Sequence, residues 1–183
     1  MTHRAQRTIA MSLCLLALLA VSLWLANGSA MLRALPEAVR IWRMPAVMEL
    51  PVPVQGVRAK RIADTWGGAR SGGRRHEGTD IFAKRGTPVT SATRGIVVRI
   101  GDYGIGGKHV WVLGPGGERH YYAHLDGWAP GLRQYRVVRA GDFLGFVGDT
   151  GNARGTPPHL HYGIYGTRGA TNPYPRLHDA PAR

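Results

Sequence analysis

The sequence predicts an all-β domain, a small and largely antiparallel sheet with a sandwich-like form, preceded by an N-terminal membrane helix. Three observations support this. Beyond Leu50, glycine-rich intervals alternate with brief runs of β-branched and aromatic residues. Strands separated by turn signals about every 8–12 residues are typical of antiparallel sheets. No stretch in this region keeps a helical period, and the only long apolar run lies at residues 9–26.

Composition allows one domain with an appendage. The chain has 183 residues and a formal net charge of +13, so it is long enough to bury a core without disulfides. Its pI of about 11.0 makes nucleic acid, an anionic membrane or a cell wall candidate partners. No basic helix, zinc-finger spacing or aromatic RNA-binding signature occurs, so we expect no nucleic-acid partner. Cys14 is the only cysteine, which excludes an internal disulfide and a thiolate metal site.

The N-terminal segment, residues 1–30, is expected to be a signal anchor or a signal peptide. An uncharged apolar run covers residues 9–26 and follows Arg4 and Arg7. The run exceeds the cleaved signal core of about 7–15 residues and just reaches the length that spans a bilayer. Cleavage after Ala30 is the alternative, and it yields a periplasmic or secreted protein. In both cases the rest of the chain is exported, and an uncleaved anchor holds it at the cytoplasmic membrane facing the periplasm or cell wall.

Residues 31–50 are predicted to be a short amphipathic linker. Apolar residues recur there at nearly helical spacing, and Pro36 and Pro45 interrupt the pattern. Because proline disfavours a helix interior, we expect a separate helix over Glu37–Met44.

The domain proper is expected over residues 51–176, followed by a tail at 177–183. Its predicted strands are Pro88–Ser91, Gly95–Ile100, His109–Leu113, Arg119–His124, Phe143–Val147 and His159–Tyr165.

The first histidine cluster is His76 with Asp80. Glycines and following β-formers disfavour a helix, so a loop entering a strand is predicted. The even spacing then places both side chains on one face, while Glu77 points away. Imidazole and carboxylate are ordinary zinc ligands, although a surface histidine with an aspartate cap is the alternative.

The second cluster ends at His124. Strand alternation predicts that His120, Tyr122 and His124 share one face, with Tyr121 and Leu125 on the other. His124 lies at the end of the strand, where side chains commonly reach into a site. His120 is given no role.

The third cluster is His159 and His161, entered through Pro157 and Pro158. Residues two apart on a strand face the same side, with Cα atoms about 6.7 Å apart. The two rings are therefore expected to share one site, with Leu160 turned into the core. The pair suits a metal ligand and a second group acting on what the metal holds. A chance pair of surface histidines is the alternative.

Together, these clusters resemble the lysostaphin/LytM-type zinc metallopeptidases, which are peptidoglycan endopeptidases. The matching stretches are HEGTDIFAKRGTPVTSATRGIVV, YYAHLDG, VRAGDFLGFVGDTGNARGTPPHLHYGI and NPYP. The resemblance covers about Leu50 to Pro175, and loops 66–75 and 128–136 depart from it. We expect both loops to border the substrate groove.

The resemblance implies short loops around a zinc groove, with Zn²⁺ held by His76, Asp80 and His161. It implies that His124 and His159 are catalytic. The implied reaction is hydrolysis of peptide bonds in peptidoglycan cross-links by a zinc-bound water assisted by two histidines, with peptidoglycan peptide stems as partners. A catalytically silent wall-binding or amidase-activating protein is the alternative, and the complete ligand set argues against it.

Overall fold

The computed structural model describes residues 3–179, and the side chains of residues 11–25 and 28–179. It divides into two compact units, Met1–Pro36 and Glu37–Arg183. The end of the expected tail, residues 180–183, lies outside the described residues.

The described residues of the first unit are all part of helix α1, which spans His3–Arg43 and ends in the second unit. Its segment Met11–Arg43 is long and apolar enough to cross a membrane. Apolar side chains such as Leu16, Leu18 and Trp24 are exposed, as expected for a helix whose apolar surface suits lipid. A signal sequence near the N-terminus can meet the same criteria of length and composition, so these do not distinguish an anchor from a signal.

Helix α1 differs from the linker predicted for residues 31–50. It continues through Pro36 to Arg43 without a break, so the separate helix expected over Glu37–Met44 was wrong. Proline removes one backbone hydrogen bond, but the strong helix formers on both sides, including Leu35 and Ala38, maintain the helix. The helix does end just before Pro45, as steric restriction ahead of proline predicts.

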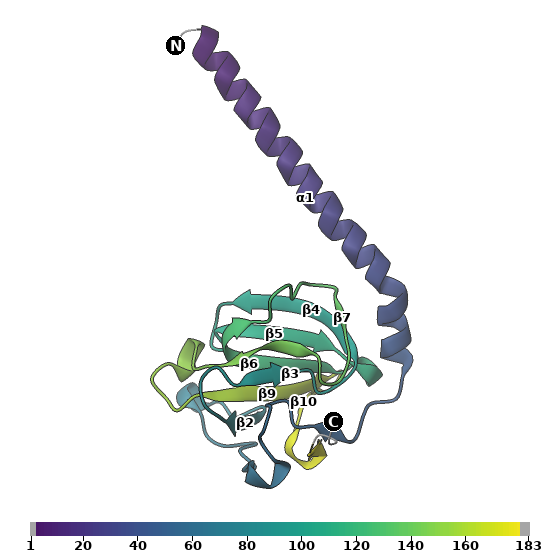
Figure 1. The fold of residues 1–183 in the computed structure, drawn as a ribbon, viewed down its shortest axis with the longest axis vertical. Coiled ribbons are helices and arrows are strands. Elements are labelled where there is room, and N and C mark those ends of the chain that lie inside the picture. Colours follow the sequence, from purple (N-terminus) through teal and green to yellow (C-terminus); the bar gives the residue numbers. More distant parts are fainter. Residues whose placement is uncertain (1–2, 180–183) are drawn as a thin grey trace. The chain divides into compact units, whose positions relative to one another are not determined.

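The second unit carries a nine-stranded sheet, and all of its pairings are antiparallel. The predicted all-β, largely antiparallel fold is therefore confirmed, and Figure 1 shows β4, β5 and β6 side by side. The strands of this sheet are β2 (Thr79–Phe82), β3 (Pro88–Thr90), β4 (Gly95–Asp102), β5 (Lys108–Leu113), β6 (Arg119–Trp128), β7 (Val137–Val138), β8 (Phe143–Val147), β9 (His159–Gly166) and β10 (Gly169–Thr171).

The sheet divides along strand β6. Residues Arg119–Ala123 pair with β9, whereas Leu125–Trp128 pair with β8. His124 lies between the two pairings. On the other edge of β9, residues His159–Tyr162 pair with β2. The histidine-bearing segments predicted from the sequence thus meet where the sheet divides.

The C-terminal boundary also differs from prediction. Strand β11 (Leu177–His178) pairs in parallel with β1 (Leu50–Pro51), and the side chains of Leu50 and Leu177 are buried. The Asp179 carboxylate accepts a hydrogen bond from the backbone N–H of Ala59 at 2.6 Å. Residues 177–179 therefore belong to the β domain, because their pairing partner lies more than a hundred residues away and gives no local signal.

His120 lies in the core of the sheet. Its ring is 1% exposed, and its Nδ1 lies 2.7 Å from the Tyr162 hydroxyl. Burial, with a smaller contribution from the nearby Arg176 guanidinium, lowers the pKa of His120 to about 3. The neutral ring is therefore a structural group.

Replacing His120 by glutamine is expected to make the fold less sensitive to acid. The lowered pKa means that the unfolded chain binds a proton more readily than the folded one. The contribution of His120 to stability is fully present above about pH 6.5 and falls by about 1.4 kcal/mol per pH unit as the pH drops toward 3. His120→Gln is expected to remove this contribution from the pH dependence measured in denaturant titrations of chelator-treated protein, and the exposed His178→Gln is expected to leave it. An unchanged slope in His120→Gln would contradict the assignment.

Candidate metal centre

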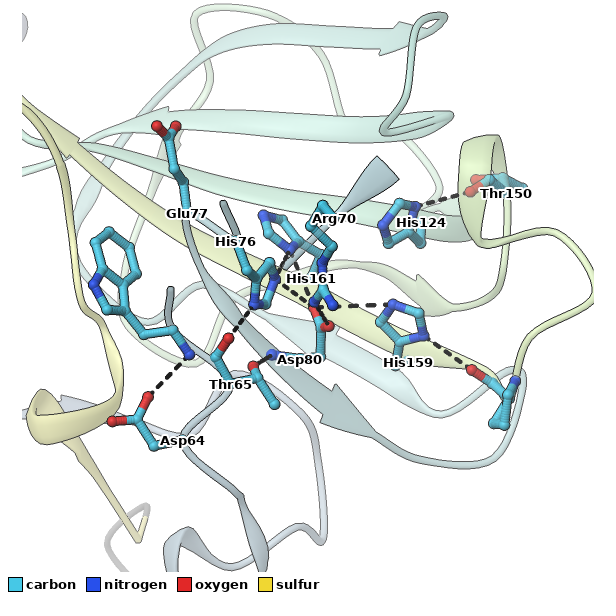
Figure 2. Close-up of polar contacts among 12 residues, drawn as sticks. Asp64, Thr65, Arg70, His76, Glu77, Asp80, His124, Thr150, His159 and His161 are labelled. Carbon is cyan, nitrogen blue, oxygen red and sulfur yellow. Dashed lines mark hydrogen bonds and ion pairs between the residues drawn. The ribbon is translucent and has the colours of Figure 1, made fainter. Parts of the chain in front are cut away.

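Three predicted ligands converge on one point in the cleft (Figure 2). His76 Nε2 lies 2.9 Å from His161 Nδ1 and 3.0 Å from Asp80 Oδ1. The His161 Nδ1 and Asp80 Oδ1 atoms are 3.1 Å apart. Among the described residues, this is the cluster of histidine, cysteine and acidic side chains able to hold a metal ion.

Strand pairing explains this convergence. Asp80 on β2 lies directly opposite His161 on β9, and cross-strand partners hold their side chains close together. His76 precedes Asp80 by four residues and lies on the same side, as predicted. In Figure 2, Glu77 points away from the three ligands.

The donor set fits a zinc ion. His76 Nδ1–H donates to the Thr65 carbonyl oxygen at 2.7 Å, which leaves the Nε2 lone pair facing the cluster. With the His161 proton on Nε2, all three converging atoms present lone pairs, an arrangement that a cation stabilises. Two imidazoles and one carboxylate are a common zinc set, and ligands at about 2.0–2.1 Å in tetrahedral geometry lie roughly 3.3 Å apart.

The protonation states agree with ligation. Burial favours the neutral form of Asp80, but the adjacent His161 and His76 rings outweigh burial and hold the Asp80 pKa below its usual value. Burial is also the main cause of the lowered pKa of His161. A carboxylate and a neutral imidazole are the forms that bind metal.

Two neighbours orient the ligands further. The Thr65 hydroxyl accepts the backbone N–H of Asp80 at 3.0 Å, in addition to the bond from its carbonyl to His76. The Arg70 guanidinium donates to Asp80 Oδ2 at 2.5 Å, so Oδ1 remains directed at the histidines. Partners of this kind fix the orientation of metal ligands.

His124 and His159 lie beside the three ligands. Their ring centroids are 5.0 Å apart, and that of His124 is 5.9 Å from that of His161. His124 Nδ1 bonds the Thr150 carbonyl at 2.8 Å, and His159 Nδ1 bonds that of Pro157 at 2.9 Å. In each ring Nε2 is therefore the nitrogen left for a substrate. Burial, followed by the nearby His161, lowers the pKa of His124 to about 4.

The route by which His124 reaches the site differs from prediction. The expected alternation placed it with His120 and Tyr122, yet those residues are in the core and His124 faces the cleft with Tyr121. A register shift in the pairing of β5 with β6 and a φ of 62° at His124 break the alternation. Positive φ is uncommon outside glycine, and this sequence carries no signal for it.

The cleft around the site has a volume of about 820 Å³. The loop at residues 66–75 contributes Arg70, Arg74 and Arg75 to the cleft, as expected. The loop at residues 128–136 was also expected to border the cleft, but none of its residues lines it. The remaining lining comes from loop residues and aromatic side chains to which no role in the site was assigned from sequence. These are Ile105, Gly106, Trp111, Tyr121, Asn152, Ala153, Thr156, Pro157 and Tyr165.

Gly78 is expected to be essential to the geometry of the metal ligands. A Cβ at this position would lie 2.5 Å from His161 Cε1 and 2.8 Å from the Tyr162 carbonyl oxygen. Gly78→Ala must therefore displace the His161 ring or strand β9, at a cost of roughly 1–3 kcal/mol. Competition with a chromophoric chelator is expected to report weaker zinc binding, together with a lower melting temperature.

Gly166→Ala is the matched control, because a Cβ on this glycine at the end of β9 meets nothing within 4 Å. Equal zinc affinity and equal melting temperature in the two variants would contradict the close contact at Gly78.

An antiparallel β domain with a His–Asp–His cluster and two further histidines in its cleft has the set of side chains that metal-dependent hydrolases use. The chain belongs to Peptidase family M23, whose sequence model matches residues 74–173.

Relatives with assigned names are similar over the same region. The chain is 42% identical over 138 residues to the L-Ala–D-Glu endopeptidase of Bacillus subtilis, covering 69% of this chain and 42% of that protein. It is 36% identical over 89 residues to lysostaphin of Staphylococcus simulans, covering 48% of this chain and 17% of that protein. The chain thus spans less than half the length of either relative.

Solved structures share the fold. A putative glycyl-glycine endopeptidase LytM from Ruminococcus gnavus superposes with a TM-score of 0.57 at 36% identity, covering 74% of this chain and 59% of that chain. Csd3 from Helicobacter pylori superposes with a TM-score of 0.58 at 31% identity, covering 74% of this chain and 36% of that chain.

Proposed function

We propose that the protein is an exported, zinc-dependent endopeptidase that hydrolyses peptide bonds in peptidoglycan cross-links. The observation that carries the proposal is the complete set of polar side chains in one cleft. His76, Asp80 and His161 would hold the zinc ion, and His124 and His159 lie beside these three residues with their Nε2 atoms available. Relatives named L-Ala–D-Glu endopeptidase, glycyl-glycine endopeptidase and peptidoglycan DD-endopeptidase support the substrate class.

Zinc, when bound by three protein ligands, supplies a Lewis acid that lowers the pKa of a coordinated water to about 7. The chain's own residues supply the remaining chemistry. One neutral imidazole of the His124–His159 pair accepts a proton from the attacking water. The other, once protonated, donates a proton to the leaving amine or stabilises negative charge on the carbonyl oxygen. The Thr150 and Pro157 carbonyls hold both rings in position for these transfers.

The apolar N-terminal segment is proposed to place this domain outside the cytoplasm. Residues 1–30 serve as signal anchor or cleaved signal, and the catalytic domain follows the helical linker. Basic residues precede the apolar run, which favours a cytoplasmic N-terminus. A reporter active only after export, fused after Arg183, is expected to be active. A silent reporter on a well-expressed fusion would contradict this topology.

Incubation with purified sacculi tests the proposed activity against the wall-binding alternative. The zinc-loaded full-length protein, in a non-ionic detergent, is expected to release soluble fragments and lower the turbidity of the suspension. Addition of a chelator is expected to stop the release. A protein that sediments with sacculi but releases nothing, with or without added zinc, would instead be a binding or activating module.

A further inference from the structure

Three arginines from one short loop line the cleft on the side of the metal ligands. Arg70, Arg74 and Arg75 all belong to the segment 66–75 and are exposed. The loop closes on itself as a small hairpin, because Ala69 forms a β-bridge with Arg75 and the backbone N–H of Arg70 donates to the Arg74 carbonyl at 2.9 Å. The hairpin thus brings three arginines to the lining of one cleft.

The loop is attached to the metal site through one of these arginines. Arg70 donates to Asp80 Oδ2 at 2.5 Å, and its side chain is 37% exposed. Figure 2 shows the Arg70 side chain directed at Asp80, close to His161. Because Asp80 is one of the three converging ligands, this bond fixes the loop beside the position where a scissile bond must lie.

The other two arginines have no carboxylate partner among the described residues. Arg74 donates to the carbonyl and hydroxyl oxygens of Ser71 at 3.1 and 3.3 Å, and Arg75 donates to the Gly67 carbonyl at 3.1 Å. A guanidinium has five N–H donors, so both groups keep donors for a ligand. The acidic side chains that line the cleft are Asp80, which is already paired, and Glu77.

We propose that Arg74 and Arg75 form a carboxylate-binding subsite, so that the preferred substrate is a peptide with a free carboxylate next to the scissile bond. The guanidinium fork matches a carboxylate in geometry and charge, and such charge-assisted pairs are among the stronger hydrogen bonds in proteins. This inference rests on the proposed function and extends its substrate from the cross-links to bonds of the anionic peptide stem. It favours an anionic peptide stem over a glycine bridge, which carries no carboxylate along its length.

Two peptides that differ in one group test the subsite. The first is L-Ala-γ-D-Glu-L-Lys with a free α-carboxylate on the glutamyl residue, and the second carries a primary amide at that carboxylate. Calorimetry with zinc-loaded, full-length His159→Ala in detergent measures binding without turnover. The acid is expected to bind about 10–100-fold more tightly than the amide. Adding Arg74→Gln and Arg75→Gln together is expected to reduce this preference to within about twofold of unity.

The matched control is Arg168→Gln, an exposed arginine in the turn between β9 and β10 that does not line the cleft. It is expected to keep the full preference for the acid. A preference that persists in the Arg74→Gln/Arg75→Gln protein would assign the carboxylate to the metal or to Arg70, and would overturn the proposal. Equal binding of the two peptides by the parent protein would overturn it as well.

Turnover by the wild-type protein separates this inference from the proposed function. If acid and amide peptides are cleaved equally well, the endopeptidase stands and the carboxylate subsite is wrong. If the acid binds selectively through the two arginines but neither peptide nor sacculi are cleaved, the subsite stands and the proposed function fails.

Discussion

Replacing His161 by alanine is expected to remove the bound zinc and abolish measurable peptidase activity. His161 Nδ1 is one of the three atoms that lie within 3.1 Å of one another, and its ring is largely enclosed. Loss of even an outer partner of a ligand costs about 10–100-fold in metal affinity, so loss of a ligand is expected to cost at least about 100-fold. A metal bound by these residues would also link β9, β2 and the loop before β2, so the melting temperature should fall when the ligand is lost.

Elemental analysis and thermal melting of the wild type, His161→Ala and His76→Ala measure this effect. Both variants are expected to contain little zinc, whereas the exposed His178→Ala keeps it in full. Wild-type protein without metal after zinc loading, or His161→Ala with full zinc, would contradict the ligand set.

Replacing His124 or His159 by alanine is expected to have a different result. Both rings hold their Nδ1 atoms against backbone carbonyls and lie next to the ligand cluster. Each variant should therefore keep zinc and a nearly unchanged melting temperature. Turnover should fall by about 10²–10⁴-fold, the usual contribution of a positioned acid or base.

Steady-state rates and zinc stoichiometry, measured on the same preparations of the two variants, test whether these histidines act in catalysis and not in zinc binding. Little change in rate in either variant would mean that these histidines are merely structural. Loss of zinc in His159→Ala, with zinc retained in His161→Ala, would reverse the roles proposed within the pair.

The parts of the site that follow local rules were predictable from sequence. His159 and His161 share a face and Leu160 is buried because a strand has a period of two residues, and the even spacing of His76 and Asp80 works in the same way. The main strands were predicted to within a few residues because their β-formers alternate with glycine-rich turns.

Features that depend on distant contacts were not predictable. His124 faces the cleft because of a bulge and a positive φ on β6, which override the expected alternation. Strand β11 exists because β1 pairs with it. The cleft wall carries Ile105 and Asn152 where residues 128–136 were expected, since loop positions depend on how the sheet divides.

The central claim, that this cleft uses zinc to hydrolyse peptide bonds of peptidoglycan, is tested most directly by mass spectrometry of products released from purified sacculi. Zinc-loaded wild-type protein is expected to generate new free amino and carboxyl termini within the peptide portion. Chelator-treated protein and the His159→Ala variant should generate few or none. Products cut in the glycan strand, or peptide cleavage that persists unchanged after the metal is removed, would contradict the account.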